Sequence, residues 1–302
     1  MSHIPVLRER VIEILRPNEG EHVLDVTLGL GGHAEAFLRA VGEGGRLTGI
    51  DADTGNIACS QEHLLEWKEQ CTFIHANFRS LATLGLGTFD IIFADLGVSS
   101  PHLDDPTRGF TFRSDAPLDL RFDQSSGRSA ADILSDATED DLKRMLREYG
   151  ELHNAGKIAS TIYAAIRHEG IKTTWQLKSV IEKAAGFRAP SILPQVFQAL
   201  RIRVNDELAA LEAFLHIAPS HLNPGGRLGI ISYHSLEDRL VKQTFRSLTT
   251  PLKDSITGAI AQDAPYQLLT PKGVKPSENE IARNPRARSA IFRAIAGKRQ
   301  TI

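Results

Sequence analysis

Residues 23–33 read VLDVTLGLGGH, an apolar run that ends in Asp25 and leads into three glycines and His33. A short apolar run before a glycine-rich turn predicts a buried strand. The residues that follow, up to Gly42, have the apolar spacing of a helix. Glycines at such a turn allow a ligand to approach the backbone. This stretch is therefore the first candidate for a binding site.

The overall composition is that of a globular protein with a substantial core. The chain has 302 residues, of which 41% are hydrophobic and 24% charged. No apolar run approaches the roughly 20 residues of a membrane helix, and charges within the first helical stretch argue against a signal peptide. Cys59 and Cys71 form no CxxC pattern, and the histidines lack metal-ligand spacing. We therefore expect a cytoplasmic protein with no metal site, no disulfide framework and no membrane partner.

Strands and helices alternate along the first third of the chain. Apolar runs predict strands at 23–28, 46–53, 71–78 and 89–100, separated by helical stretches. Residues 129–200 look entirely helical, with two helix starts, at Ser129 and Thr138, each followed three residues later by an aspartate. Strand patterns return at 223–235 and 289–296. This order predicts the α/β class: a doubly wound, Rossmann-like sheet with an inserted all-helical domain.

The predicted domains are a first part of the sheet core at 1–105, a helical insertion at 106–203, and a second part of the core at 204–302. Residues 101–128 are rich in Pro, Asp, Arg and Gly but contain Phe110, Phe112 and Phe122, so we expect an ordered loop. Residues 271–302 carry eight Lys or Arg against two Glu, a net charge of +6, which leaves −8 for the rest. This basic C-terminal segment suggests a polyanionic partner, although a solvated tail is the plain alternative.

The glycine turn allows two readings of its ligand. Gly29, Gly31 and Ala34 fit a G-x-G-x-x-A fingerprint, with Asp51 at the place of a ribose-binding acid, which would indicate a dinucleotide. However, Asp25, Asp51 and Asp95 are predicted at the carboxyl ends of three strands, where the ligand of a doubly wound sheet binds. Three acids suit a cationic ligand with a ribose, such as S-adenosylmethionine, better than a pyrophosphate. Each residue also has a structural alternative, since the glycines could only form a turn and Asp51 could cap a helix.

Several longer stretches carry a family resemblance. They are HIPVLRERV, DVTLGLGGH, DLGVSSPHLDDPTRGFTFRSDAPLDLRFD, FQALRIRVNDELAALE, PGGRLGIISYHSLEDRLVK and NPRARSA, in this order across nearly the whole chain. The sequence strongly resembles the bacterial small-subunit (16S) ribosomal RNA cytosine-N4 methyltransferases. The resemblance implies S-adenosylmethionine as cofactor and a methyltransferase core interrupted by a helical substrate-recognition domain. It also implies methylation of a cytidine N4 amine in the decoding region, with the ribosomal RNA or the assembled small subunit as partner.

The resemblance also assigns donor contacts, which we list by position. They are Gly31, Gly32, His33, Asp51, Phe78, Asp95 and His102. Many relatives have Gln at position 102, so the contact of His102 is open to rearrangement. Relatives also have Glu at the position of Leu152 and Arg at that of Gln195, departures that bear on RNA recognition and not on the cofactor. The sequence leaves the oligomeric state open, a homodimer included.

Methyl transfer to a cytosine amine needs a group that accepts the N4 proton. Asp95, at the end of the fourth strand, or a backbone carbonyl in the loop that follows it, is the first candidate for this catalytic role. His234 and Ser235, after the last core strand, are the second. His234 could instead only begin the helix that follows. A flipped-out cytidine could stack on Phe110, Phe112 or Phe122, although such rings more often form the core of a loop. Phosphate contacts are predicted for five arginines: Arg108, Arg113, Arg121, Arg286 and Arg288.

Other functions stay open at this point. One is a methyltransferase of the same fold that acts on another RNA, and a second is a non-catalytic RNA-binding assembly factor. A third is a nicotinamide dehydrogenase, which would bind NAD in place of the methyl donor. The cofactor that the protein binds separates the third from the other two.

Overall fold

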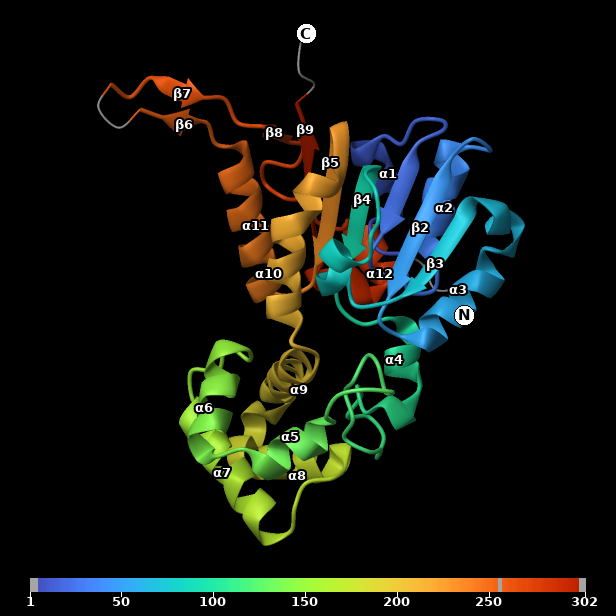
Figure 1. Ribbon diagram of the computed structural model, residues 1–302. Helices are drawn as coiled ribbons and strands as arrows, with labels where there is room; N and C mark the ends of the chain where they lie inside the picture. Colours follow the sequence, from blue (N-terminus) through green and yellow to red (C-terminus); the bar gives the residue numbers. More distant parts are fainter. Residues whose placement is uncertain (1–4, 255–256, 299–302) are drawn as a thin grey trace. The chain divides into compact units, whose positions relative to one another are not determined.

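The computed structural model describes residues 5–254 and 257–298. The chain divides into two compact units. The first, here called the core unit, contains residues 1–97 and 210–302, and the second, the helical unit, contains residues 98–209 (Figure 1). The helical unit thus begins before and ends after the expected insertion at 106–203.

A seven-stranded sheet of order β3-β2-β1-β4-β5-β9-β8 forms the centre of the core unit. The first five strands pair in parallel, whereas β9 is antiparallel to both β5 and β8. The strand order reverses between β1 and β4, the point at which open α/β sheets bind ligands. The strands are β1 (His22–Asp25), β2 (Arg46–Asp51), β3 (Cys71–His75), β4 (Phe89–Asp95), β5 (Leu222–Ser232), β8 (Tyr266–Leu268) and β9 (Ile291–Gly297).

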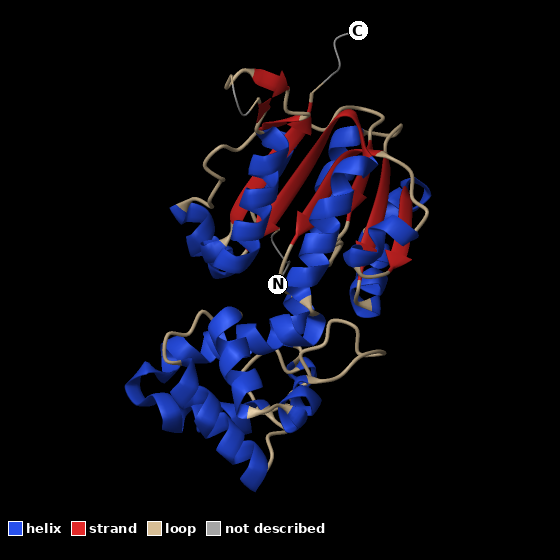
Figure 2. Ribbon diagram, turned by 60° about the vertical axis from the view of Figure 1, so that its left-hand side comes forward, coloured by secondary structure: helices blue, strands red, loops and turns tan. Residues whose placement is uncertain are grey.

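Helices cover both faces of this sheet (Figure 2). Successive strand residues point to opposite faces, so Val23 and Ile91 pack into one hydrophobic core with α1 and α2, whereas Leu24 and Ile92 pack into another with α10 and α11. The apolar runs of the sequence therefore belong to strands that are buried on both sides. The helices of this unit are α1 (Arg8–Leu15), α2 (Gly32–Val41), α3 (Thr54–His63), α10 (Glu207–Ile217, which begins within the helical unit), α11 (Ser235–Thr249) and α12 (Glu278–Arg283).

The helical unit has a hydrophobic core of its own. Both helix starts predicted from the sequence are confirmed as capping boxes: Ser129 pairs with Asp132 at the start of α5, and Thr138 with Asp141 at the start of α6. The predicted loop at 101–128 contributes Phe110, Leu118 and Leu120 to the core, which explains its order. The helices are α4 (Ser100–Asp104), α5 (Ala130–Asp136), α6 (Glu139–Glu148), α7 (Ala155–His168), α8 (Thr174–Ala185) and α9 (Ala189–Asn205).

The strands are shorter than the apolar runs predicted. β1, β2 and β4 end at Asp25, Asp51 and Asp95, and the predicted continuations to residues 28, 53 and 100 are turns or the start of a helix. Apolar residues beyond a strand end, such as Val26 and Leu28, are still buried because the turn folds back onto the core. The length of an apolar run therefore did not predict the residue at which strand pairing ends.

The basic C-terminal segment is not a solvated tail, and the strand predicted at 289–296 is confirmed. Residues 291–297 form β9, which lies between β5 and β8, and Ala287 and Ala290 before it are buried. Arg293, counted among the tail cations, is 8% exposed and forms a two-bond ion pair with Asp238 of α11 (2.6 and 3.0 Å). Arg299 lies outside the described residues. The sequence reading also missed β8 and the small hairpin of β6 (Leu252–Lys253) and β7 (Ile260–Gln262).

Within residues 5–254 and 257–298, every helix is too short or too polar to cross a membrane.

Candidate functional site

Three acids meet at one edge of the sheet. Asp25, Asp51 and Asp95 are the last residues of β1, β2 and β4, which are neighbours in the order β2-β1-β4. All three strands run in the same direction, so their carboxyl ends share this edge, and β1 and β4 flank the point of order reversal. The structure thus brings together the three acids that the sequence placed at strand ends.

Asp51 holds the glycine turn. One carboxylate oxygen accepts a hydrogen bond from the Gly29 N–H (2.8 Å), and the other accepts from the Asp53 N–H (2.8 Å). The Asn56 side chain donates to the same carboxylate at 3.2 and 3.3 Å. Asp51 does not cap α3, because Asp53 occupies that position and accepts from the Gly55 N–H. The acid of the second strand and the turn after the first are therefore one hydrogen-bonded unit.

A tyrosine hydroxyl holds Asp95, and a buried histidine lies beside it. The Tyr233 hydroxyl donates to Asp95 Oδ1 at 2.8 Å, and His33 Nε2 lies 3.5 Å from Asp95 Oδ2. The backbone N–H of Asp95 donates to the hydroxyl of Thr27, so the turn after β1 also positions the end of β4. The Asp95 side chain is 20% exposed, and Tyr233 leaves its Oδ2 without a hydroxyl donor from the part of the chain that the structure describes. Burial and the neighbouring Asp95 carboxylate raise the pKa of Tyr233, so the hydroxyl stays a donor.

Tyr233 was missed by sequence reasoning, which weighed His234 and Ser235 instead. The feature that could have identified Tyr233 is its position in the sequence. It directly follows β5, the neighbour of β4, and therefore lies at the same edge of the sheet.

Asp25 is the most deeply buried acid of the site, with 1% of its surface exposed. Removal from water raises its pKa to about 7, against an opposing effect of His33 and of the Thr27 N–H that donates to Oδ1. Its second oxygen, Oδ2, is buried without a hydrogen-bond partner among the described residues, and so is His33 Nε2. Buried polar atoms are normally paired, and an unpaired one is a place where a ligand can supply the missing partner.

The residues of this edge fit a cationic methyl donor. An ammonium or sulfonium group suits the unpaired Oδ2 of Asp25, and ribose hydroxyls suit the strand end at Asp51. Glycine is required at positions 29, 31 and 32 for two different reasons. Gly29 and Gly31 have positive φ (53° and 81°), whereas a Cβ on Gly32 would come within 2.5 Å of the Pro5 ring. Gly32 is thus small because Pro5 packs on it, while Gly29 and Gly31 make the turn.

The other predicted donor contacts lie in different surroundings. Phe78 begins a short 3₁₀ helix in the core unit, with its ring edge-on to Phe214 at 5.5 Å. His102 belongs to the helical unit, where its ring stacks on Phe110 (5.0 Å) and its Nδ1 accepts from the Ser99 N–H (3.1 Å). Phe110 in turn stacks on Phe122 (5.7 Å). His102 is therefore already engaged in ring packing and a capping box.

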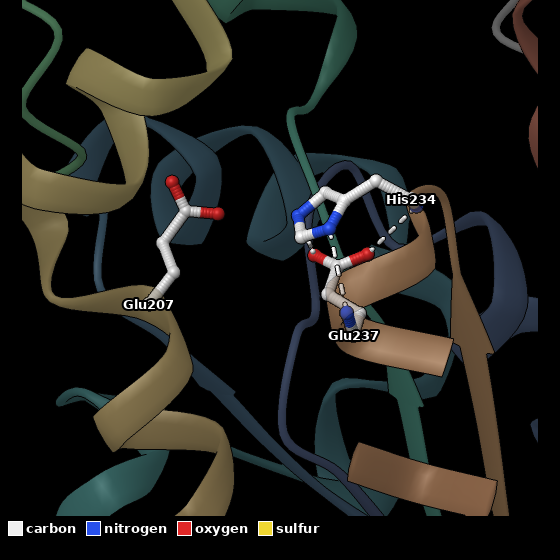
Figure 3. Close-up of side chains that lie close together, drawn as sticks. All are labelled: Glu207, His234 and Glu237. Atoms are coloured by element: carbon white, nitrogen blue, oxygen red, sulfur yellow. Dashed lines mark hydrogen bonds and ion pairs between the residues drawn. The ribbon is translucent and has the colours of Figure 1, made fainter. Parts of the chain in front are cut away.

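His234 is the N-cap residue of α11, directly before its first helical residue (Figure 3). Its Nδ1 accepts from the Glu237 N–H (3.3 Å), and its Nε2 lies 3.1 Å from a Glu237 carboxylate oxygen. The same carboxylate accepts from the Tyr233 N–H (2.8 Å). His234 thus takes the helix-start position that the sequence allowed, and Ser235 is the first helical residue. The capping box fixes the backbone that carries Tyr233 toward Asp95.

The aromatic residues and two arginines of the long loop are used internally. Phe112 packs against Phe197 (5.2 Å), and Phe110 and Phe122 stack on each other, so core is the reading the structure favours for all three. The Arg108 guanidinium donates to two backbone carbonyls of the loop, and Arg121 forms a bidentate pair with Asp119 (2.8 Å each). Three predicted phosphate contacts remain on the surface: Arg113, Arg286 and Arg288.

Comparison with known proteins supplies the family. Residues 1–298 match the family described as MraW methylase family. The chain belongs to this family. The methylase is 45% identical over 305 residues to the ribosomal RNA small subunit methyltransferase H of Syntrophotalea carbinolica, an alignment that covers 97% of each chain. The proteins of the same name from Thermomicrobium roseum (43%, covering 97% of this chain and 93% of that one) and Symbiobacterium thermophilum (40%, covering 97% and 96%) are similar to it.

Family membership confirms several expectations. The chain is a methyltransferase with a doubly wound, Rossmann-like sheet, and S-adenosylmethionine is its methyl donor. The dinucleotide reading of the glycine turn, and with it the nicotinamide dehydrogenase, is thereby excluded.

Proposed function

We propose that this methylase transfers a methyl group from S-adenosylmethionine to N4 of a cytidine in the decoding region of small-subunit ribosomal RNA. The relatives support the ribosomal substrate by their names. The observation that carries the chemistry is the Asp95 carboxylate, partly exposed at the switch point and held by Tyr233 and His33. A ribosomal substrate also agrees with the expected cytoplasmic location.

The donor supplies an electrophilic methyl group on a sulfonium, so the chain must position the amine and remove a proton. A bond forms between N4 and the methyl carbon as the sulfur–carbon bond breaks, and one N4 proton must leave. Tyr233 occupies Asp95 Oδ1, so Oδ2 is the oxygen that accepts this proton. His33 Nε2, 3.5 Å from Oδ2, stabilises the carboxylate in the correct orientation.

The donor is proposed to contact Gly31, Gly32, His33, Asp51, Phe78, Asp95 and His102, as the resemblance implies, with Asp25 facing its cationic part. The helical unit is proposed as the substrate-recognition domain. Of the five predicted phosphate contacts, Arg113, Arg286 and Arg288 are exposed. Arg108 and Arg121 would have to give up internal hydrogen bonds to reach a phosphate, so we assign them to holding the loop.

Donor binding is expected to weaken as the pH falls below about 7. The pKa of Asp25 is raised to about 7, and a cationic ligand binds the ionised form, so affinity falls toward tenfold per pH unit below that value. Binding at about pH 7 then releases about half a proton. Calorimetry in two buffers of different ionisation enthalpy measures this release, and an affinity that is flat between about pH 6 and pH 8 would contradict the role of Asp25.

Incubation with labelled donor and small ribosomal subunits from a strain that lacks the protein tests the function. We expect label in N4-methylcytidine at one position, identified by nucleoside analysis. Naked ribosomal RNA is the parallel substrate and shows whether the assembled subunit is required. Label in another nucleoside or in another RNA would favour the same fold with a different target. Donor binding without transfer to any RNA would favour the assembly-factor alternative.

A further inference from the structure

Two large aromatic side chains of the helical unit are exposed, and both belong to α8 or to its end. Trp175 is 49% exposed and Phe187 is 91% exposed. They contrast with Phe110, Phe112 and Phe122, the rings considered for base stacking from the sequence, which pack into the core of the same unit. An aromatic ring in water at a fixed position needs a reason, because burial would be favourable.

The charge of the helical unit is divided along the chain. Residues 98–156 contain seven Lys or Arg and twelve Asp or Glu, a net charge of −5, whereas residues 157–209, the rest of the unit, contain eight Lys or Arg and four Asp or Glu, a net charge of +4. Both exposed rings fall in the cationic part. Of its four acids, Glu182 lies 4.0 Å from Lys178 and Glu207 pairs with Arg201 at 2.8 Å. The part of the unit that carries the rings therefore has a net positive charge, which favours a polyanionic partner.

Backbone geometry holds Phe187 outward. Gly186, at the C-cap of α8, has a φ of +56°, and a short 3₁₀ turn over Gly186–Arg188 leads directly into α9. The Arg188 guanidinium lies over the Phe187 ring, 5.6 Å from its centroid. Residues 183–191 contain Lys183 and Arg188 but no acid. The ring and the two cations thus lie at the corner between α8 and α9.

A hollow of about 410 Å³ lies along the same helix. It is lined by Trp175, Ser179 and Lys183, which follow one another at intervals of four residues on one face of α8. Two acids, Asp115 and Glu169, also line it; Asp115 accepts a hydrogen bond from the Trp175 backbone N–H (3.3 Å), and a Glu169 oxygen lies 3.2 Å from His168 Nδ1. An aromatic wall and a hydroxyl beside an open space suit a stacked base, whereas the acids leave Lys183, with Arg188 outside the hollow, as the contacts for phosphate.

We propose that the surface formed by Trp175, Ser179, Lys183, Phe187 and Arg188, here called the α8 surface, binds unpaired nucleotides of the RNA substrate. One base stacks on Phe187 and one on Trp175, and the cations contact the intervening phosphates. The inference rests on the proposed function for the identity of the RNA, but the binding itself requires no methyl transfer. The bases are therefore expected to stack on the α8 surface and not on the rings of the loop at 101–128.

The test is binding of a fluorescent, unstructured RNA of about 12 nucleotides, compared with a duplex of the same sequence. Phe187→Ala is expected to weaken single-strand binding by roughly 5- to 100-fold, with duplex binding nearly unchanged. Phe187→Trp should retain binding because it keeps a stacking face. Lys183→Glu should lower the slope of affinity against salt. In a Trp67→Phe background, Trp175 is the only tryptophan, so quenching of its emission by the RNA reports stacking directly.

Leu65→Ala is the matched control, because Leu65 is a 65% exposed apolar residue of the core unit; its RNA affinity should equal that of the unaltered protein. Single-strand binding by Phe187→Ala within twofold of the unaltered protein would overturn the proposal. So would a defect seen with assembled subunits but not with naked RNA, which would indicate a protein partner for this surface. If the unaltered protein methylates no ribosomal RNA yet shows the Phe187 effect, the proposed function fails while the α8 surface stands.

Discussion

Replacement of Asp25 with asparagine is expected to stabilise the donor-free protein and to abolish donor binding at the same time. The folded-state pKa of Asp25 is about 7 and its ordinary value is 3.8. A raised pKa means that the stability contributed by this group is present below the ordinary value and is lost as the pH rises through the folded-state value. The loss amounts to about 4 kcal/mol at the upper limit, from about 3 pKa units at 1.4 kcal/mol each.

Asparagine carries no charge and avoids this loss, but its buried amide costs about 1–3 kcal/mol. We therefore expect the free energy of unfolding of Asp25→Asn to be about 1–3 kcal/mol higher than that of the unaltered protein at about pH 8. Tm should rise by several degrees. Below about pH 4 the advantage should disappear, because Asp25 is then neutral in both states. The thermal shift caused by S-adenosylmethionine should be lost in the variant. A variant that is no more stable at about pH 8 would show that burial of the ionised Asp25 does not lower the stability. A variant that still responds to the donor would show that Asp25 does not face it.

The second large effect concerns Asp95. Asp95→Asn keeps the shape of the side chain and an oxygen that can accept from Tyr233, but it removes the carboxylate that takes the N4 proton. We expect kcat to fall roughly a hundred- to ten-thousandfold at saturating donor, the usual contribution of a positioned base. Single-turnover methylation of small subunits at saturating donor measures this without a contribution from weaker donor binding. Circular dichroism should show an unchanged fold.

Tyr233→Phe is the matched control for Asp95→Asn. It removes the hydrogen bond to Asp95 Oδ1 but leaves the carboxylate, so a loss of less than about tenfold is expected. Retention of more than a tenth of the rate by Asp95→Asn would place the acceptor elsewhere, with His234 the next candidate. His234→Asn would then be the informative change, since asparagine is a good N-cap and would preserve the start of α11 while it removes the imidazole.

The edge that carries the three acids was predictable because it depends on short-range order. Strand alternation and glycine punctuation located β1, β2 and β4, although the predicted strands continued past their ends, and parallel pairing then placed the three acids at one edge. The hydrogen bond from Gly29 to Asp51 spans 22 residues, and that from Tyr233 to Asp95 spans 138. Such contacts depend on register and turn geometry, which a single sequence does not specify.

The C-terminal segment shows a different limit. Counting charges treats every Lys or Arg as solvated, but Arg293 sits inside a strand and pairs with Asp238. The alternation in SAIFRAIA was recognised as a strand, yet the charge argument took the same residues as a free tail. The structural reading of Phe110 and Phe122, by contrast, followed from a general rule: an ordered loop of this length needs a core of its own.

The position of β9 also constrains when this protein can become complete. The helical unit is one continuous segment, residues 98–209, and its core can form as soon as that segment has been synthesised. The sheet cannot, because β9, which lies between β5 and β8, is formed by residues 291–297, well after the helical unit has ended. The helical unit can therefore finish folding while the sheet still lacks the strand that joins β5 to β8.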